Sequence, residues 1–218
     1  VSENPQKIDF NYNTNTPKGD IMHANGIDYD AEKDVIHISV NFYNEIWVID
    51  HSVSIQEATT DSGGNYNKGG DLIYRYGNPL AYKNSEGSQI FNNNHFPNLL
   101  EGEVQGKGNM LIYVNNFGNL EQSIVYELEL PETYNLLPNV NNEPNIVWSY
   151  TNSNMYASKF SGAVRLPNGN TLICEGDYGY WEVTQSKDVV WKYDGNGTSF
   201  WRGYSYKTDS SSLDNFNF

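Results

Sequence analysis

The stretch that decides the fold is GNMLI at residues 108–112, which recurs as GNTLI at residues 169–173. Each copy is followed by an apolar segment with Glu before Leu or Val, and then by Val-Trp-x-Tyr at residues 147–150 and 190–193. Short apolar segments bounded by Gly, Asn, Asp and Pro are typical of β-strands. The repeat therefore predicts an all-β fold made of recurring strand units.

A third, looser copy runs through residues 35–39, 46–49 and 71–76. Three repeats of about four strands each are typical of β-propeller blades. A β-sandwich would also supply short alternating strands, but it does not predict a Trp that recurs at one place in each unit. We therefore favour a propeller over a sandwich.

We expect a single propeller domain, or the C-terminal portion of one, over residues 1–218. The approximate blades are residues 19–80, 91–151 and 160–194, with residues 195–218 as a closing segment. The segments that we expect to be strands are residues 35–40, 45–50, 71–76, 109–114, 123–130, 146–150, 171–174, 180–184 and 189–193.

The charge of the chain restricts its partners. Thirteen Lys and Arg stand against 27 Asp and Glu, which gives a formal net charge of −14. A field of that sign repels nucleic-acid phosphates and anionic lipid surfaces. We therefore expect no nucleic-acid partner, and an anionic substrate needs local cationic or hydrogen-bonding groups that outweigh the field.

Cys174 is the only cysteine, so no internal disulfide is possible. It follows two apolar residues, and we expect it to be a buried strand residue, because a lone Cys is commonly buried. No run of residues is long and apolar enough for a membrane span, and no signal peptide is visible at Val1. Membrane insertion is therefore not expected.

Four segments together resemble the aryl-sulfate sulfotransferase family: HANGIDYD at residues 23–30, NEIWVIDHS at 44–52, GGDLIYRYGNP at 69–79 and RLPNGNTLI at 165–173. The closing residues 200–206 are similar to the end of a bacterial branch of these proteins. The resemblance implies a six-bladed β-propeller with a central funnel, of which this chain carries only some blades. It also implies a periplasmic or extracellular location.

Members of this family transfer a sulfuryl group from an aryl sulfate to a phenol through a sulfo-histidine. On this resemblance the candidate catalytic residues are His23 and His95, and the candidate substrate-binding residues include Asn25. Sulfuryl transfer spreads charge over the sulfate oxygens, so donors aimed into a dry pocket and a nucleophilic imidazole would lower the barrier.

Asn115 and Asn116 follow an expected strand where the family has an Asn-rich turn, and they are further candidate substrate-binding residues. Asn-rich turns are also frequent for conformational reasons alone, since Asn tolerates left-handed geometry. Tyr178 is the last candidate for substrate binding, as an aromatic contact. We expect no cofactor and assign no metal, because the acidic turns match no dedicated Ca²⁺ loop.

Two departures from the family pattern are visible. Gln122-Ser123 stands where the family has a sulfate-binding Ser-Arg pair, and residues 174–181 contain no His where the nucleophile would be sought. Arg75 and Arg165 could contact sulfate, but for both we expect exposed pairing instead. His37 and His51 are expected to be structural.

The sequence leaves two function classes open. One is an enzyme of the sulfotransferase type that uses His23 and His95. The alternative is a non-catalytic propeller that binds a glycan, a phenolic compound or a protein at the cell surface, with Tyr178, Tyr180 or Trp181 at the contact, since aromatic faces suit sugar and phenol rings. The oligomeric state is left open.

Overall fold

The computed structural model describes residues 1–13, 19–118, 120–206 and Leu213. These residues form three four-stranded antiparallel sheets, each a meander in which strands adjacent in sequence are hydrogen-bonded neighbours. The expectation of an all-β fold with four-stranded units is confirmed. The helical elements that lie wholly within the described residues are short 3-10 turns: Asn41–Tyr43 (η2), Glu57–Thr59 (η3) and Pro79–Tyr82 (η4).

We call the sheets A, B and C in chain order. Sheet A holds β1 (Ala24–Asp30), β2 (Val35–Val40), β3 (Glu45–Asp50) and β4 (Leu72–Tyr76). Sheet B holds β5 (Asn94–Leu99), β6 (Met110–Val114), β7 (Ile124–Glu129) and β8 (Asn145–Thr151). Sheet C holds β9 (Gly162–Arg165), β10 (Thr171–Glu175), β11 (Gly179–Val183) and β12 (Val189–Asp194).

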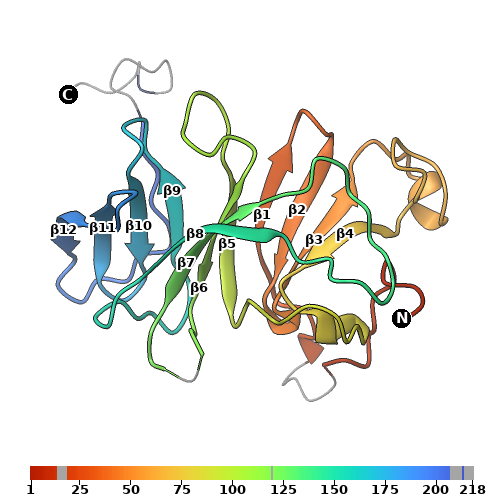
Figure 1. Ribbon diagram of the computed structural model, residues 1–218, viewed down its shortest axis with the longest axis horizontal. Coiled ribbons are helices and arrows are strands. Elements are labelled where there is room, and N and C mark those ends of the chain that lie inside the picture. The colour runs from red at the N-terminus through yellow and green to blue at the C-terminus, as the bar shows by residue number, and fades with distance from the viewer. Residues whose placement is uncertain (14–18, 119, 207–212, 214–218) are drawn as a thin grey trace.

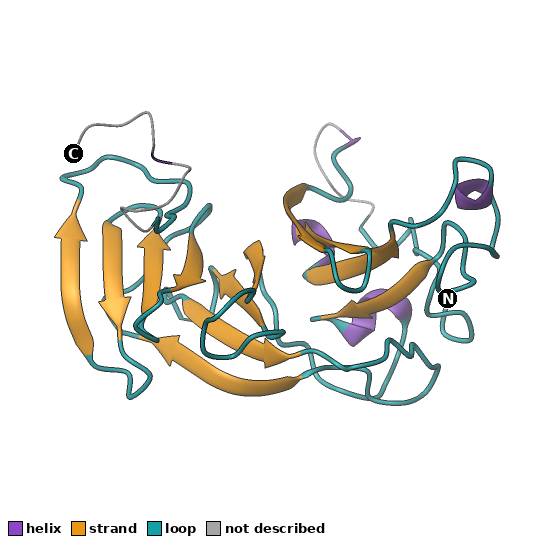
Figure 2. Ribbon diagram, turned by 90° about the horizontal axis from the view of Figure 1, so that it is seen from above, coloured by secondary structure: helices purple, strands orange, loops and turns teal. Residues whose placement is uncertain are grey.

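The first strand of each sheet is its innermost strand. β5 contacts both β1 and β9, so the three first strands lie side by side, and sheet B stands between the other two (Figures 1 and 2). Strands β4 and β12 lie at the far ends of the row (Figure 1). Sheets that radiate from their first strands form a propeller-like arrangement.

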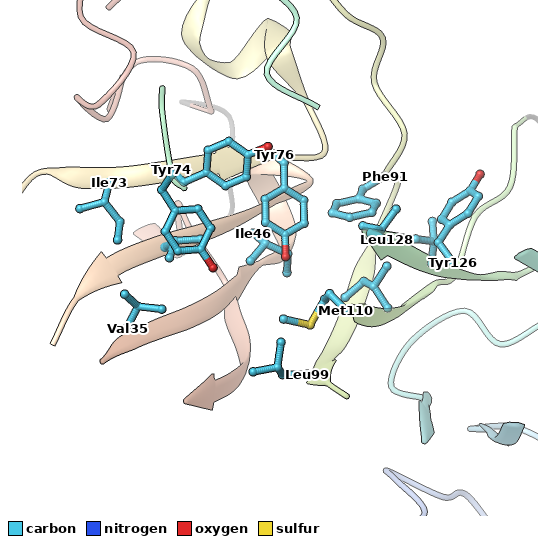
Figure 3. Close-up of a cluster of buried hydrophobic side chains, with 14 of the residues drawn as sticks. Val35, Ile46, Ile73, Tyr74, Tyr76, Phe91, Leu99, Met110, Tyr126 and Leu128 are labelled. Atoms are coloured by element: carbon cyan, nitrogen blue, oxygen red, sulfur yellow. The ribbon is translucent and has the colours of Figure 1, made fainter. Parts of the chain in front are cut away.

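Two buried apolar clusters join the sheets face to face. Between sheets A and B, Ile46, Tyr74 and Tyr76 pack against Phe91 and Met110 (Figure 3). The second cluster joins sheets B and C, where Trp148 and Tyr150 of β8 pack with Ile173 and Trp181. Alternating strand residues supply these clusters, because every second side chain points to the same face of a sheet.

The innermost strands approach closely at Phe96, which carries a positive φ of 54° in a bulge of β5. An added Cβ at Gly162 of β9 would lie 2.2 Å from the Phe96 ring, and one at Gly26 of β1 would lie 2.7 Å from Pro97. Only glycine fits at these two positions. The three sheets can therefore meet around Phe96.

Arg75 and Arg165 are not exposed as expected, because both are buried ion-pair partners. Arg75 donates from Nε to Glu45 at 2.8 Å and packs 4.6 Å from the Tyr82 ring centre. Arg165 of sheet C donates to Glu127 of sheet B at 2.5 Å. A buried guanidinium needs a partner of this kind, since an unpaired charge is costly away from water.

Candidate functional site

A cavity of about 120 Å³ lies where the starts of β1 and β5 meet the loop before β9 and the closing segment. We call it the axial pocket. Its lining residues are His23, Asn25, His95, Phe96, Lys159, Phe160, Ser161, Trp201 and Arg202. The structure thus brings together both candidate catalytic residues and one candidate substrate-binding residue, which come from two different sheets.

His95 is an almost fully buried residue of β5 whose ring orientation is set by Asn115. The His95 Nδ1 atom lies 2.6 Å from Asn115 Oδ1, and the Asn115 amide nitrogen donates to the carbonyl oxygens of Ala157 and Phe160. Because the Asn115 oxygen can only accept, His95 donates through Nδ1–H and Nε2 keeps its lone pair. Asn115 therefore orients the His95 ring and does not itself line the pocket.

Burial lowers the pKa of His95 to about 4. Desolvation disfavours the charged form of an imidazole, so the ring is neutral at neutral pH. A neutral imidazole with a free Nε2 lone pair is a nucleophile or a proton acceptor.

His23 lies at the rim of the axial pocket and is half-exposed. Its Nδ1 atom is 2.6 Å from the Asp20 carboxylate, and its ring stacks on Phe42 at a centroid distance of 4.8 Å. The hydrogen bond from His23 lowers the pKa of Asp20. A carboxylate on Nδ1 orients the ring and leaves Nε2 free for proton transfer.

Asn25 follows His23 at the start of β1. Its amide nitrogen donates to the Asn94 carbonyl oxygen at 2.9 Å, which ties β1 to β5. Its side-chain oxygen is buried and has no hydrogen-bond partner among the described residues. Buried polar atoms are usually paired, so this oxygen is an exception at the edge of the pocket.

Two cations line the pocket that the sequence analysis did not assign to it. Arg202, in the closing segment, donates from Nη2 to the Asn25 carbonyl oxygen at 3.0 Å and stacks 4.9 Å from the Phe96 ring centre. Lys159 is exposed and lies 5.4 Å from the Phe160 ring centre. The only sequence signal for Arg202 was its place in the closing segment that resembles the family.

The closing segment forms one wall of the pocket. Trp201 stacks on Phe160 at a centroid distance of 4.2 Å, and Tyr204 meets the Phe96 ring edge-on at 5.8 Å. Through Arg202 the segment also reaches Asn25 of sheet A. One pocket therefore draws its walls from the start of sheet A, from sheet B, from the loop before β9 and from the closing segment.

Asn116 and Tyr178 do not line the axial pocket. Asn116 lines a separate hollow with Asn92 and Phe117. Tyr178 packs against Trp181 at 5.8 Å between ring centroids. Trp181 itself is 1% exposed, so the interpretation of this Trp as a ligand contact is wrong.

The two departures from the family pattern have structural roles here. Ser123 is buried, donates to the Asn115 carbonyl oxygen at 2.9 Å and accepts from the Ala157 backbone, so it supports the Asn115 loop. Glu175 is buried and accepts hydrogen bonds from the Trp181 indole at 2.6 Å and the Tyr156 backbone at 2.8 Å.

The remaining expectations concern single side chains. His37 is buried in β2, and His51 is an exposed partner of Asp34 at 2.7 Å. Cys174 is buried, as predicted.

Within the described ranges, no group of three His, Cys, Asp or Glu side chains is placed to hold a metal ion, and no helix is long and apolar enough to cross a membrane.

Neither a protein-family model nor a curated protein matches this sequence.

Proposed function

We propose that the chain transfers a sulfuryl group from an aryl sulfate to a phenolic acceptor in the axial pocket. The observation that carries this proposal is the convergence of His23, Asn25 and His95 with two cations, Lys159 and Arg202, in one cavity of a strongly acidic chain. The resemblance to the exported aryl-sulfate sulfotransferases supports the same reading, and with it a periplasmic or extracellular location.

The net charge of −14 repels an anionic substrate, and the two cations of the pocket offset that repulsion locally. Lys159 and Arg202 supply positive charge locally at the cavity. A local positive charge can outweigh the long-range field of an acidic chain at one site. We assign the sulfate oxygens to these two side chains, and Phe96 and Phe160 to the aryl ring.

His95 is proposed as the nucleophile. Its Nε2 lone pair forms an N–S bond to the sulfuryl group while the S–O bond to the aryl group breaks, and the electron pair leaves with the phenolate oxygen. Positive charge then develops on the imidazole, and the hydrogen bond from Nδ1–H to Asn115 at 2.6 Å stabilises it. A preoriented donor–acceptor pair contributes to catalysis because it does not need to reorganise.

His23 is proposed as the acid and base at the rim. As imidazolium it donates a proton to the departing phenolate, and as neutral imidazole it accepts the proton of the phenol that attacks the sulfo-histidine. The second attack re-forms His95 and leaves the new aryl sulfate. The Asp20 carboxylate, 2.6 Å from Nδ1, holds the His23 ring in position for both steps.

The test is acceptor-dependent release of nitrophenol from nitrophenyl sulfate. His95→Ala is expected to lower the rate at least about a hundredfold, and His23→Ala to lower it less, because a general acid can be replaced in part by water. His51→Ala, in an exposed His–Asp pair outside the pocket, is the matched control and should leave the rate unchanged.

An unchanged rate in His95→Ala would remove this residue from the mechanism. Binding of nitrophenyl sulfate without any release, measured by calorimetry on folded protein, would instead support the alternative of a non-catalytic binding propeller. In that case Arg202→Gln should still weaken binding, because the anion contact does not depend on turnover.

A further inference from the structure

A second hollow, of about 440 Å³, lies at the edge of the apolar cluster that joins sheets A and B. We call it the amide hollow. Its volume is within the range of about 300–1,000 Å³ that is usual for small-molecule sites. The proposed sulfuryl transfer uses none of its residues. The described lining residues are Gln89, Ile90, Phe91, Asn92, Asn116, Phe117, Gly118 and Tyr126.

Backbone hydrogen bonds hold the segment before β5 against the turn after β6. The Asn115 N–H donates to the Asn93 carbonyl oxygen at 3.0 Å, and the Asn116 N–H donates to the Asn92 carbonyl oxygen at 3.1 Å. These two bonds continue the pairing of β5 with β6 beyond the ends of both strands. Asn92 and Asn116 are therefore fixed opposite each other without any ligand.

The asparagines beside the hollow divide into two groups. The side chains of Asn93, Asn94 and Asn115 donate to other strands and loops at 3.0, 2.8 and 2.7 Å. By contrast, the side chains of Asn92 and Asn116 form no hydrogen bond to any described residue, and Asn92 is exposed while Asn116 is half-buried. Two preoriented amide groups are thus left for a ligand, and each can both donate and accept.

Aromatic rings supply the apolar part of the hollow. Phe117 is partly buried against the cluster between sheets A and B, and its N–H donates to the Gln122 carbonyl oxygen at 2.8 Å. Phe91 and Tyr126 lie at the edge of that cluster, and the Tyr126 hydroxyl points away from it (Figure 3). The hollow therefore combines ring faces with neutral polar groups.

None of the described lining residues is charged, although the chain has a net charge of −14. These residues offer an anion no cationic partner and a cation no carboxylate. A hydroxyl group both donates and accepts, as an amide does, and an aromatic face suits a sugar ring. We infer that the amide hollow binds a neutral sugar, with the sugar ring on Phe117 and its hydroxyl groups on Asn92 and Asn116.

The amide hollow is separate from the axial pocket, and the two share no lining residue. Asn115 holds the His95 ring at 2.6 Å, whereas Asn116, the next residue, lines the hollow. Two neighbouring asparagines thus serve two different sites. A sugar in the hollow leaves the axial pocket open.

The test is calorimetry of the whole chain with maltose, cellobiose, lactose and diacetylchitobiose as neutral probes. We expect at least one of them to bind in the millimolar range or more tightly. Asn116→Ala and Phe117→Ala should each weaken this binding at least about fivefold, because one removes a hydrogen-bonding group and the other a ring face. Asn92→Ala, at an exposed position that folding does not depend on, should have the same effect as Asn116→Ala.

Asn154→Ala, which changes an exposed asparagine in the turn after β8, is the matched control and should leave sugar binding unchanged. Arg202→Gln, which alters the axial pocket, should leave it unchanged as well. Absence of binding to all four sugars would overturn the inference. So would binding that survives both Asn92→Ala and Asn116→Ala, or binding that is lost in Arg202→Gln.

Discussion

At the scale of the residue, the site depends on how each imidazole is held. Asn115 fixes the His95 ring through Nδ1 at 2.6 Å, and Asp20 fixes His23 at the same distance. The two partners differ in charge, and the two histidines differ in burial, so the buried ring stays neutral while the exposed ring lies beside a carboxylate. Groups in environments of this kind are suited to different roles in one reaction.

A second buried histidine gives a prediction about pH. Burial lowers the pKa of His37 to about 4, against about 6.5 in an unfolded chain. Between these two pKa values the unfolded state binds more protons than the folded state. The free energy of unfolding is therefore unaffected by His37 above about pH 6.5 and falls as the pH drops toward 4. For His37 alone the loss amounts to about 3 kcal/mol in the free energy of unfolding.

Urea unfolding at a series of pH values checks this expectation. The His37→Gln variant should lose less stability than the wild type between pH 6.5 and 4, because Gln does not titrate. His51→Gln, at an exposed position, serves as the control. Parallel stability curves for His37→Gln and the wild type would contradict the prediction.

At the scale of the element, the sequence analysis found nine of the strands but not the innermost strand of any sheet. β5 contains Pro97 and a bulge, β9 is only Gly162–Arg165, and β1 has a mixed burial pattern. Close approach around Phe96 requires Gly and a bulge, and these residues weaken the alternating pattern by which strands are recognised. The strands that build the site were therefore the hardest to predict.

The same elements explain which site residues could be predicted. His23 and Asn25 lie in a segment that resembles the family, His95 was matched to a family position, and the structure places all three at the axial pocket. Lys159 and Arg202 come from loops, and Arg202 reaches Asn25 only because the closing segment returns to the innermost strands. No local pattern predicts a contact between residues so far apart in the sequence.

The close approach of β9 and β5 is testable by one methyl group. Gly162→Ala places a Cβ 2.2 Å from the Phe96 ring and should lower the free energy of unfolding by about 1–3 kcal/mol. In a Phe96→Ala background the same substitution should cost much less, because the obstructing ring is gone. Equal costs in the two backgrounds, measured by urea unfolding, would show that the strands do not meet at this ring.

At the scale of the whole molecule, three sheets radiate from first strands that lie side by side, and the axial pocket forms at one end of these strands. The chain as a whole is strongly acidic, yet this pocket gathers Lys159, Arg202 and two histidines. A cationic pocket in an acidic molecule attracts a small anion locally, as the proposed function requires.

The most direct test of the proposed chemistry is mass spectrometry of the protein after brief incubation with nitrophenyl sulfate and no acceptor. A sulfo-histidine intermediate cannot be discharged to a phenol under these conditions, so the account predicts a sulfo group on the peptide that contains His95, and its absence in His95→Ala. Nitrophenol release with no sulfo group on His95, or a sulfo group on another residue, would contradict it.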